Sequence, residues 1–337
     1  MKIAILSPIA WRTPPRNYGP WEQVASTICE GLIKSGIEVS LFATGDSITS
    51  GTLKWVCERG YAEDPAIDPK VWESLHISNL MEQAGEFDLI HNHFDFLPLT
   101  YSSLIKTPIL TTIHGFSSPK ILPVYQRYNA NTHYISISDA DRHPSLNYLR
   151  TIHHGINPED FPYCEEKEDY LLYFGRIHPD KGTHTAIEIA RLSGSKLKIA
   201  GFIQDKEYFD ARVGPHLDSG KVEYVGNADP ESRKQLLGKA KALLHPIYFD
   251  EPFGLSVVEA MMCGTPVIAF NRGSMPELIL NGTTGFLVNT VEEAIKAAES
   301  LHLISPENCR KHALRNFSTG RMIENYLEAY REILRSR

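Results

Sequence analysis

The sequence lacks several features that would place it in other classes of protein. Its 337 residues contain no apolar run of about 18, the length that a membrane-spanning helix needs. The opening stretch MKIAILSPIAW becomes polar too soon for a signal peptide. The five cysteines lie far apart, are odd in number, and show no metal-ligand spacing. These absences favour a reduced, cytoplasmic protein.

Positive charge is not in excess either. The chain has 34 Lys and Arg against 41 Asp and Glu, which gives a formal net charge of -7. Such a chain is a poor general binder of nucleic acid or anionic lipid. The first half also contains no cationic amphipathic helix that would dock on a membrane. We therefore expect no nucleic-acid partner and no strong membrane association.

Common cofactor and catalytic motifs are absent as well. No GxGxxG follows the first apolar segment, and there is no Walker loop or GxSxG elbow. No Asp-X-Asp pair lies in a convincing loop. Two histidine pairs, His91 with His93 and His153 with His154, have no obvious third metal ligand. We therefore expect no metal and no other cofactor, a weak case for a dehydrogenase, and structural roles for these histidines.

Short apolar runs alternate with helical patterns along the whole chain. Continuous apolar runs suit strands that are buried on both faces of a parallel sheet. Residues 22–35 suit the helix of a βα unit, with Gly36 beyond its end. The expected strands cover residues 2–8, 38–44, 88–93, 108–114, 133–138, 169–176, 196–201, 222–226, 242–246 and 265–270. This alternation predicts an α/β protein with two Rossmann-like domains.

A polar segment separates the two sets of expected strands. Residues 157–168 (NPEDFPYCEEKE) contain two prolines and many acids, which is typical of an interdomain linker. We therefore predict an N-terminal domain over residues 1–156 and a C-terminal domain over 157–317. The tail, residues 318–337, carries a helical apolar stripe that has to be buried somewhere.

Two loops of the second half hold the strongest candidates for ligand binding. In FGRIHPDKG, Arg176 and Lys181 lie in one loop between a strand and a helix, where two cations can hold a diphosphate without a metal. The alternative is a solvated loop with Asp180 as N-cap. In FDEPFGLSVVEAMM, Glu251 and Glu259 flank a glycine turn and the start of a helix. The free amides of that helix start suit a phosphate, and Glu259 suits the hydroxyls of a ribose. The alternative is a helix-start acid and a surface glutamate.

The first half offers two weaker candidates. In the stretch YGPWE, residues 18–22, Gly19 allows a ligand to approach the start of a helix closely. His114 ends an expected strand, where a histidine can donate to a sugar hydroxyl or stabilise charge. Taken alone, these residues are better explained by an ordinary turn and a structural histidine.

Together these stretches resemble the retaining GT-B glycosyltransferases of family 4. The most specific match is E-x-F-G-L-x-x-x-E, which runs here from Glu251 to Glu259. CGTPVIAFNRGSMPELI, NGTTGFLV, FGRIHPDKG and HHGIN are also similar to stretches of that family. The family's first-domain loop commonly reads YGGxE, whereas Pro20 and Trp21 follow Gly19 here.

The resemblance implies two Rossmann-like domains facing across a cleft, with the C-terminal helix packed back on the first. It implies a nucleotide sugar donor of UDP, GDP or ADP type and a carbohydrate or small-molecule acceptor. Arg176 and Lys181 would hold the diphosphate, Glu259 the ribose, and Glu251 the donor sugar. The residues implied to line the donor site beside them are Gly19, Phe253, Gly254 and Leu255. The residues implied to be catalytic are His114, which would contact the donor sugar from the first domain, Glu251, Arg176 and Lys181. The implied reaction is hexosyl transfer with retention of configuration and without a metal.

Two other functions stay open on this pattern. Sugar-nucleotide epimerases share the two-domain architecture, and a non-catalytic nucleotide-sugar binding protein would need the same contacts. The pattern E-x-F-G-L-x-x-x-E and the glycine loop of the first half favour transfer. A dehydrogenase is the least favoured function, because the first apolar segment is not followed by GxGxxG.

Overall fold

The computed structural model describes residues 1–16, 19–116 and 118–336. Tyr18, which begins the predicted glycine loop, lies outside the described residues. The chain forms two compact units, Met1–Gly155 with Thr319–Arg337, and Ile156–Ser318. No helix of the described residues has both the length and the apolar character that crossing a membrane would require.

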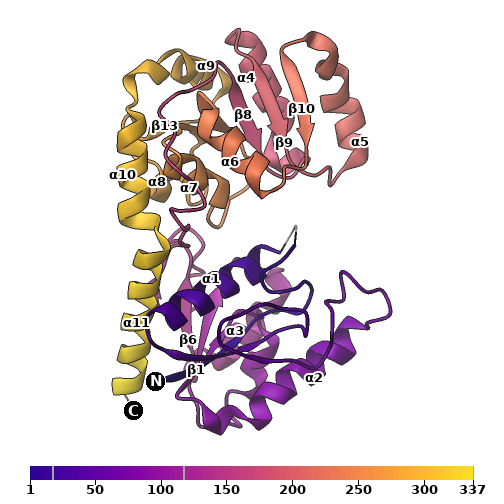
Figure 1. Cartoon of the computed structure of the whole chain (residues 1–337), viewed down its shortest axis with the longest axis vertical. Coiled ribbons are helices and arrows are strands. Elements are labelled where there is room, and N and C mark those ends of the chain that lie inside the picture. Colours follow the sequence, from indigo (N-terminus) through magenta and orange to yellow (C-terminus); the bar gives the residue numbers. More distant parts are fainter. Residues whose placement is uncertain (17–18, 117, 337) are drawn as a thin grey trace. The chain divides into compact units, whose positions relative to one another are not determined.

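The first unit is built on a parallel sheet of seven strands, in the order β3-β2-β1-β4-β5-β6-β7 (Figure 1). The strands are β1 (Lys2–Leu6), β2 (Glu38–Phe42), β3 (Thr52–Lys54), β4 (Leu89–Asn92), β5 (Ile109–Ile113), β6 (His133–Ser136) and β7 (Tyr148–Thr151). The central strands are buried on both faces, which explains their uninterrupted apolar sequences. The chain order reverses between β1 and β4, so the switch point of this sheet lies at their carboxyl ends.

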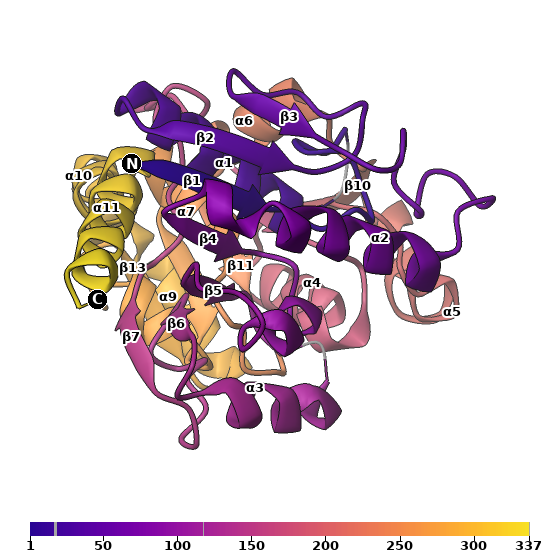
Figure 2. The same ribbon diagram turned by 90° about the horizontal axis from the view of Figure 1, so that it is seen from below.

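Helices cover both faces of the first sheet (Figure 2). They are α1 (Pro20–Lys34), α2 (Pro69–Glu82), α3 (Leu122–Tyr128) and α11 (Thr319–Arg335), with short 3₁₀ turns η1 (Ala84–Glu86), η2 (Leu97–Tyr101) and η3 (Pro119–Ile121). The apolar faces of α1 and α11 pack with Ile3, Ile5 and Leu41, whereas α2 packs with Ala4 and Leu6 on the opposite face. The stripe of the tail is buried through Met322, Ile323, Tyr326, Tyr330 and Ile333.

The second unit is built on a parallel sheet of six strands, in the order β10-β9-β8-β11-β12-β13. The strands are β8 (Leu171–Phe174), β9 (Leu197–Ala200), β10 (Val222–Gly226), β11 (Ala242–His245), β12 (Val267–Phe270) and β13 (Gly285–Val288). The helices are α4 (Thr183–Leu192), α5 (Lys206–Tyr208), α6 (Pro230–Lys239), α7 (Leu255–Met262), α8 (Met275–Leu278), α9 (Val291–Glu299) and α10 (Pro306–Phe317). Shorter turns are η4 (Pro179–Lys181), η5 (Phe209–Val213), η6 (Gly214–Ser219) and η7 (Leu301–Leu303).

The prediction of an α/β protein with two parallel, helix-covered sheets is confirmed. All ten predicted strands are present, and most end one or two residues earlier than predicted. The predicted helix at residues 22–35 is α1, and the helix start predicted between Glu251 and Glu259 is that of α7. Three strands were not predicted, namely β3, β7 and β13.

Candidate functional site

The candidate site of the second unit lies at the carboxyl ends of β8 and β11. The chain order reverses between these two neighbouring strands, and ligands of doubly wound sheets bind at such a switch point. Lys181 ends η4 after β8, His245 ends β11, and Glu251 follows in the next loop. The fold therefore brings two loops to one place that are about 70 residues apart in sequence.

Lys181 and Glu251 form an ion pair at this place. The two side chains are only 13% and 14% exposed. Nε2 of His245 lies 3.6 Å from Oε2 of the same carboxylate. Burial would raise the pKa of Glu251, but the neighbouring His245 and Lys181 outweigh burial and lower it to about 2. The carboxylate is therefore ionised at neutral pH, whereas burial lowers the pKa of His245 and favours its neutral form.

A glycine allows the Lys181 loop to approach β11. Gly182 has a φ of +69°, in the left-handed region, and a Cβ built on it would lie 2.0 Å from the carbonyl oxygen of Pro246. A larger residue would have to move the loop away from β11. The ammonium of Lys181 also lies 4.6 Å from the centre of the Phe249 ring, which further restricts its position.

The N-cap of α7, Gly254, follows Glu251 by three residues. It has a φ of +98°, and no side chain caps the first turn. The amide of Val257 donates to the carbonyl of Gly254 at 3.1 Å, and a helix start without a side-chain cap suits an anion. Phe253, by contrast, is buried, and its ring packs edge-on against Phe317. Its side chain belongs to the packing of the unit, and the predicted contacts of Phe253, Gly254 and Leu255 with a donor stay predictions.

Glu259 lies on the buried side of α7 and pairs with Arg233 of α6. Its side chain is 5% exposed, so the alternative reading as a surface glutamate is wrong. The guanidinium of Arg233 lies 5.2 Å from the centre of the Phe174 ring, at the end of β8. Arg233 could not be predicted from the sequence, because α6 contains several charged residues and nothing in its pattern distinguishes this one.

Arg176 does not join these ion pairs. It follows β8, and its guanidinium donates to the side chain of Gln204, while its carbonyl accepts from the hydroxyl of Tyr173 at 2.7 Å. The alternative of a solvated loop with Asp180 as N-cap is wrong about the cap, because the N-cap of η4 is His178. Arg176 and Lys181 thus lie in one loop but have separate partners in this structure.

In the first unit, His114 lies in a row of three histidines. Its Nε2 is 2.9 Å from Nδ1 of His93, and its Nδ1 is 3.5 Å from Nε2 of His154. The indole of Trp21 stacks on the same ring, with 5.6 Å between centroids. Burial, and then the neighbouring imidazoles, hold the pKa of His114 well below its usual value, so the ring is neutral. His93 and His154, predicted to be structural, therefore contact the predicted catalytic histidine.

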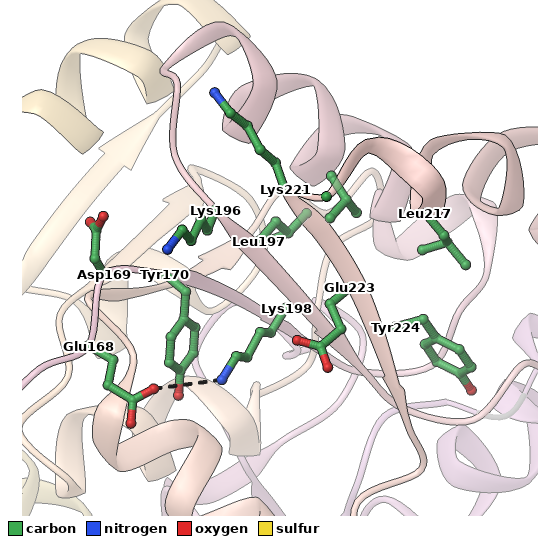
Figure 3. A pocket seen from close by; sticks show the side chains of 12 residues that line it. Glu168, Asp169, Tyr170, Lys196, Leu197, Lys198, Leu217, Lys221, Glu223 and Tyr224 are labelled. Atoms are coloured by element: carbon green, nitrogen blue, oxygen red, sulfur yellow. Dashed lines mark ion pairs between the residues drawn. The ribbon is translucent and has the colours of Figure 1, made fainter.

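Gly19 is the N-cap of α1 and lines a cavity of about 410 Å³ within the first unit. A different pocket, of about 730 Å³, lies at the amino ends of β8, β9 and β10 (Figure 3). Lys196, Lys198 and Lys221 line this second pocket together with acids, and Lys198 pairs with Glu168 at 3.7 Å. The switch point lies at the other ends of the strands, their carboxyl ends. Among the described residues, no cluster of His, Cys, Asp and Glu has the geometry to hold a metal ion.

Known proteins share this fold over the whole chain. A sucrose-phosphate synthase of Thermosynechococcus elongatus superposes with a TM-score of 0.80 at 19% identity, covering all of both chains. An Anabaena protein solved with UDP-glucose superposes with a TM-score of 0.71 at 17% identity, over 98% of this chain and all of its own. These likenesses show that the fold is GT-B.

Sequence comparison assigns the family. A glycogen synthase of Mycobacterium tuberculosis is 32% identical over 151 residues, which are 42% of this chain. The chain spans only 36% of the length of that relative. Residues 22–160 match the family described as Glycosyltransferase Family 4, and residues 160–317 match Glycosyl transferases group 1. The resemblance seen in the sequence is thereby confirmed, and the chain belongs to the family 4 glycosyltransferases of the GT-B fold.

Proposed function

We propose that the protein transfers a hexosyl group from a nucleotide diphosphate sugar to a hydroxyl group of a carbohydrate or small molecule, with retention at the anomeric carbon and without a metal ion. The observation that carries the proposal is the ion pair of Lys181 with Glu251, three residues before the N-cap of α7, where no side chain caps the helix. This pair supports a donor site in which a cation, an ionised acid and the amides of a helix start act together at the switch point of the second sheet.

Lys181 and Arg176 would act on the diphosphate. As the bond between the anomeric carbon and the diphosphate oxygen breaks, negative charge grows on the leaving group. Lys181, Arg176 and the amides at the start of α7 would stabilise that charge. Glu251 and Gln204 accept from the two cations and restrict their positions. This preorganisation lowers the cost of placing them when the donor binds.

The two acids of the motif would have different roles. Glu251 is ionised, and it would accept hydrogen bonds from hydroxyls of the transferred sugar while keeping Lys181 in place. Glu259 would accept from the ribose with the carboxylate oxygen that Arg233 does not hold. The ring of His114 is neutral and would contribute hydrogen bonding rather than charge.

Retention fits an attack from the face that the diphosphate leaves. The acceptor oxygen bonds to the anomeric carbon as the carbon–diphosphate bond breaks, and the acceptor proton passes to the departing phosphate oxygen. No separate protein base is needed, and no metal is needed if the cations neutralise the leaving group. The predicted cytoplasmic location stays a prediction.

The Anabaena protein solved with UDP-glucose makes UDP-sugars the first donors to test, ahead of GDP- and ADP-sugars. We expect release of nucleotide from the matching donor, with loss of at least about 100-fold in turnover for Lys181→Ala and Arg176→Ala. Turnover near that of the unmodified protein in both variants would overturn these assignments. Incubation with a donor and no acceptor separates the alternatives. An epimerase would give a new sugar nucleotide, and a binding protein would give neither a new sugar nucleotide nor released nucleotide.

A further inference from the structure

His245 ends a central strand of the second sheet. It is the last residue of β11, which pairs with β8 on one side and with β12 on the other. Its side chain is 7% exposed, and Nε2 lies 3.6 Å from Oε2 of Glu251. This nitrogen is buried and makes no hydrogen bond within the described chain. Because a buried polar atom without a partner costs stability, the position of Nε2 just short of a carboxylate oxygen needs an explanation.

The oxygen beside Nε2 already accepts a hydrogen bond. Lys181 donates to the same Oε2 of Glu251, so one oxygen has two nitrogens beside it and is bonded to one of them. Tyr173, on β8, is close enough to Glu251 to be affected by its charge, but its hydroxyl donates to the carbonyl of Arg176 at 2.7 Å. Among the described residues, Lys181 and His245 are therefore the two side chains placed to donate to this oxygen.

The main chain of Glu251 is held from another side. The amide of Ser274 donates to the carbonyl of Glu251 at 3.0 Å. A Cβ built on Gly273 would lie 2.4 Å from the amide nitrogen of Glu251, so the two chain segments are in close contact. These contacts fix the backbone and leave the side chain as the part that can turn. The direction of the carboxylate therefore depends on the group that donates to Oε2.

A bound diphosphate would change the balance at this oxygen. It carries several negative charges, so it attracts the ammonium of Lys181 more strongly than a single carboxylate does. Glu251 would then be an ionised and largely buried acid whose partner has turned away, which is strongly destabilising. A movement of about 0.7 Å would bring Nε2 of His245 to the usual hydrogen-bond distance of about 2.9 Å from Oε2.

We propose that His245 is a positioning residue, which becomes the hydrogen-bond donor to Glu251 when the nucleotide sugar binds. Its Nε2–H donates to Oε2 as Lys181 turns to the diphosphate, so the carboxylate keeps its direction towards the hydroxyls of the transferred sugar. A neutral imidazole suffices, because it has one N–H to donate and adds no charge that would compete for the phosphates. The proposal rests on the proposed function, because the exchange begins when a diphosphate reaches Lys181.

NMR of the histidine rings tests this exchange without turnover. In protein that carries isotope-labelled histidine, the ring of His245 is assigned by the signals that His245→Gln loses. We expect its proton on Nε2. We also expect the Nε2 proton to move downfield, as a new hydrogen bond requires, both on addition of UDP and in Lys181→Ala without UDP. Glu251→Ala, which lacks the acceptor, should show no such movement.

The outcomes of the NMR experiment separate the two proposals. A ring proton on Nδ1, or an Nε2 signal that neither UDP nor Lys181→Ala moves, would overturn the role of His245. If calorimetry shows that UDP binds in that case, the proposed function stands and only the exchange is wrong. If no nucleotide binds at all, the proposed function fails and the exchange fails with it.

Kinetics show whether the exchange serves the reaction. With a UDP-sugar that turns over, His245→Leu should lower kcat at least about 10-fold, the effect of losing a hydrogen bond to a charged group, and should change the Kd of UDP less than about 3-fold. His245→Gln should restore most of the turnover, because its amide can donate from nearly the position of Nε2. His302→Leu, at an exposed histidine of η7, is the control and should leave both constants unchanged. Equal losses in the Leu and Gln variants of His245, or no loss in either, would contradict a role as donor to Glu251.

Discussion

Lys181 and Glu251 form a largely buried ion pair across two loops of the second unit, although 70 residues separate them in the sequence. The pair holds the ammonium against a carboxylate that precedes the N-cap of α7 by three residues. A diphosphate that binds there would meet a cation already oriented by an acid, with its side-chain entropy largely lost in advance.

Removing the ammonium should therefore affect nucleotide binding and not only turnover. We expect Lys181→Ala to weaken UDP binding by about 10- to 100-fold, the value of a charge-assisted contact of roughly 1.5–3 kcal/mol. Isothermal titration calorimetry measures the change. Lys206→Ala is the control, because Lys206 is 81% exposed and pairs with Asp210 on the surface of the same unit. Equal Kd values for the two variants would contradict a diphosphate role for Lys181.

Glu22 should make the stability of the protein depend on pH. Burial raises its pKa from 4.5 to about 7, so the folded state binds the proton more tightly than the unfolded chain does. Stability from this group is therefore present below pH 4.5 and is lost as the pH rises to 7, with a total of at most about 3 kcal/mol.

The variant Glu22→Gln removes this titration. We expect its free energy of unfolding to equal or fall below that of the unmodified protein at pH 5, and to exceed it at pH 8. Urea unfolding at the two pH values measures both differences. Glu207→Gln, at an exposed position of α5, should show no such crossover. A difference that is constant from pH 5 to pH 8 would show that Glu22 is ionised throughout.

Glu259 should confer a preference for ribose over deoxyribose. Arg233 holds one oxygen of its carboxylate. Under the proposed function, the other would accept from a 2′- or 3′-hydroxyl. We expect the unmodified protein to bind UDP at least about 10-fold more tightly than 2′-deoxy-UDP, and Glu259→Gln to lose most of that ratio. Calorimetry with both nucleotides gives the ratio directly. A variant that weakens binding of the two nucleotides equally would place Glu259 outside the ribose site.

The sequence could predict the interior of both sheets but only one of their four edges. Nine of the ten predicted strands lie in the interior of a sheet, whereas the tenth, β10, is an edge strand with an exposed Glu223. The three that escaped prediction, β3, β7 and β13, are all edge strands. An edge strand needs apolar residues on fewer sides, and β7, with the sequence YLRT, is half-buried throughout. Its polar residues therefore hide it from a search for apolar runs.

The candidate site was also only partly predictable from the sequence. Glu251, Lys181 and Glu259 lie in motifs of unusual composition, and their loops were correctly placed at the carboxyl ends of strands. The partners that set their chemistry, His245 and Arg233, lie elsewhere in the sequence and stand out only once the sheet is assembled. His245 could have been predicted as a site residue from its position, because it lies at the carboxyl end of a predicted strand, as the Lys181 loop does.

Gly182 offers a test of how closely the Lys181 loop must approach β11. Both Gly182 and Gly194 have a left-handed φ, +69° and +71°, and they flank the same helix, α4. A Cβ on Gly194 would meet no atom within 4 Å, whereas a Cβ on Gly182 would meet the carbonyl oxygen of Pro246 at 2.0 Å. The substitution Gly194→Ala should therefore lower stability only through the left-handed backbone, by about 1–2 kcal/mol. The substitution Gly182→Ala adds a clash with the backbone to the same strain.

We expect Gly182→Ala to lower the free energy of unfolding by at least about 1–3 kcal/mol more than Gly194→Ala does. The clash should also push Lys181 away from Glu251, so Gly182→Ala should weaken UDP binding at least about 10-fold while Gly194→Ala leaves it unchanged. Urea unfolding and calorimetry on the two variants separate the effects, because both share the strain in φ and only one disturbs the loop. If the two variants bind UDP equally well, the position of the ammonium does not depend on the contact between Gly182 and Pro246.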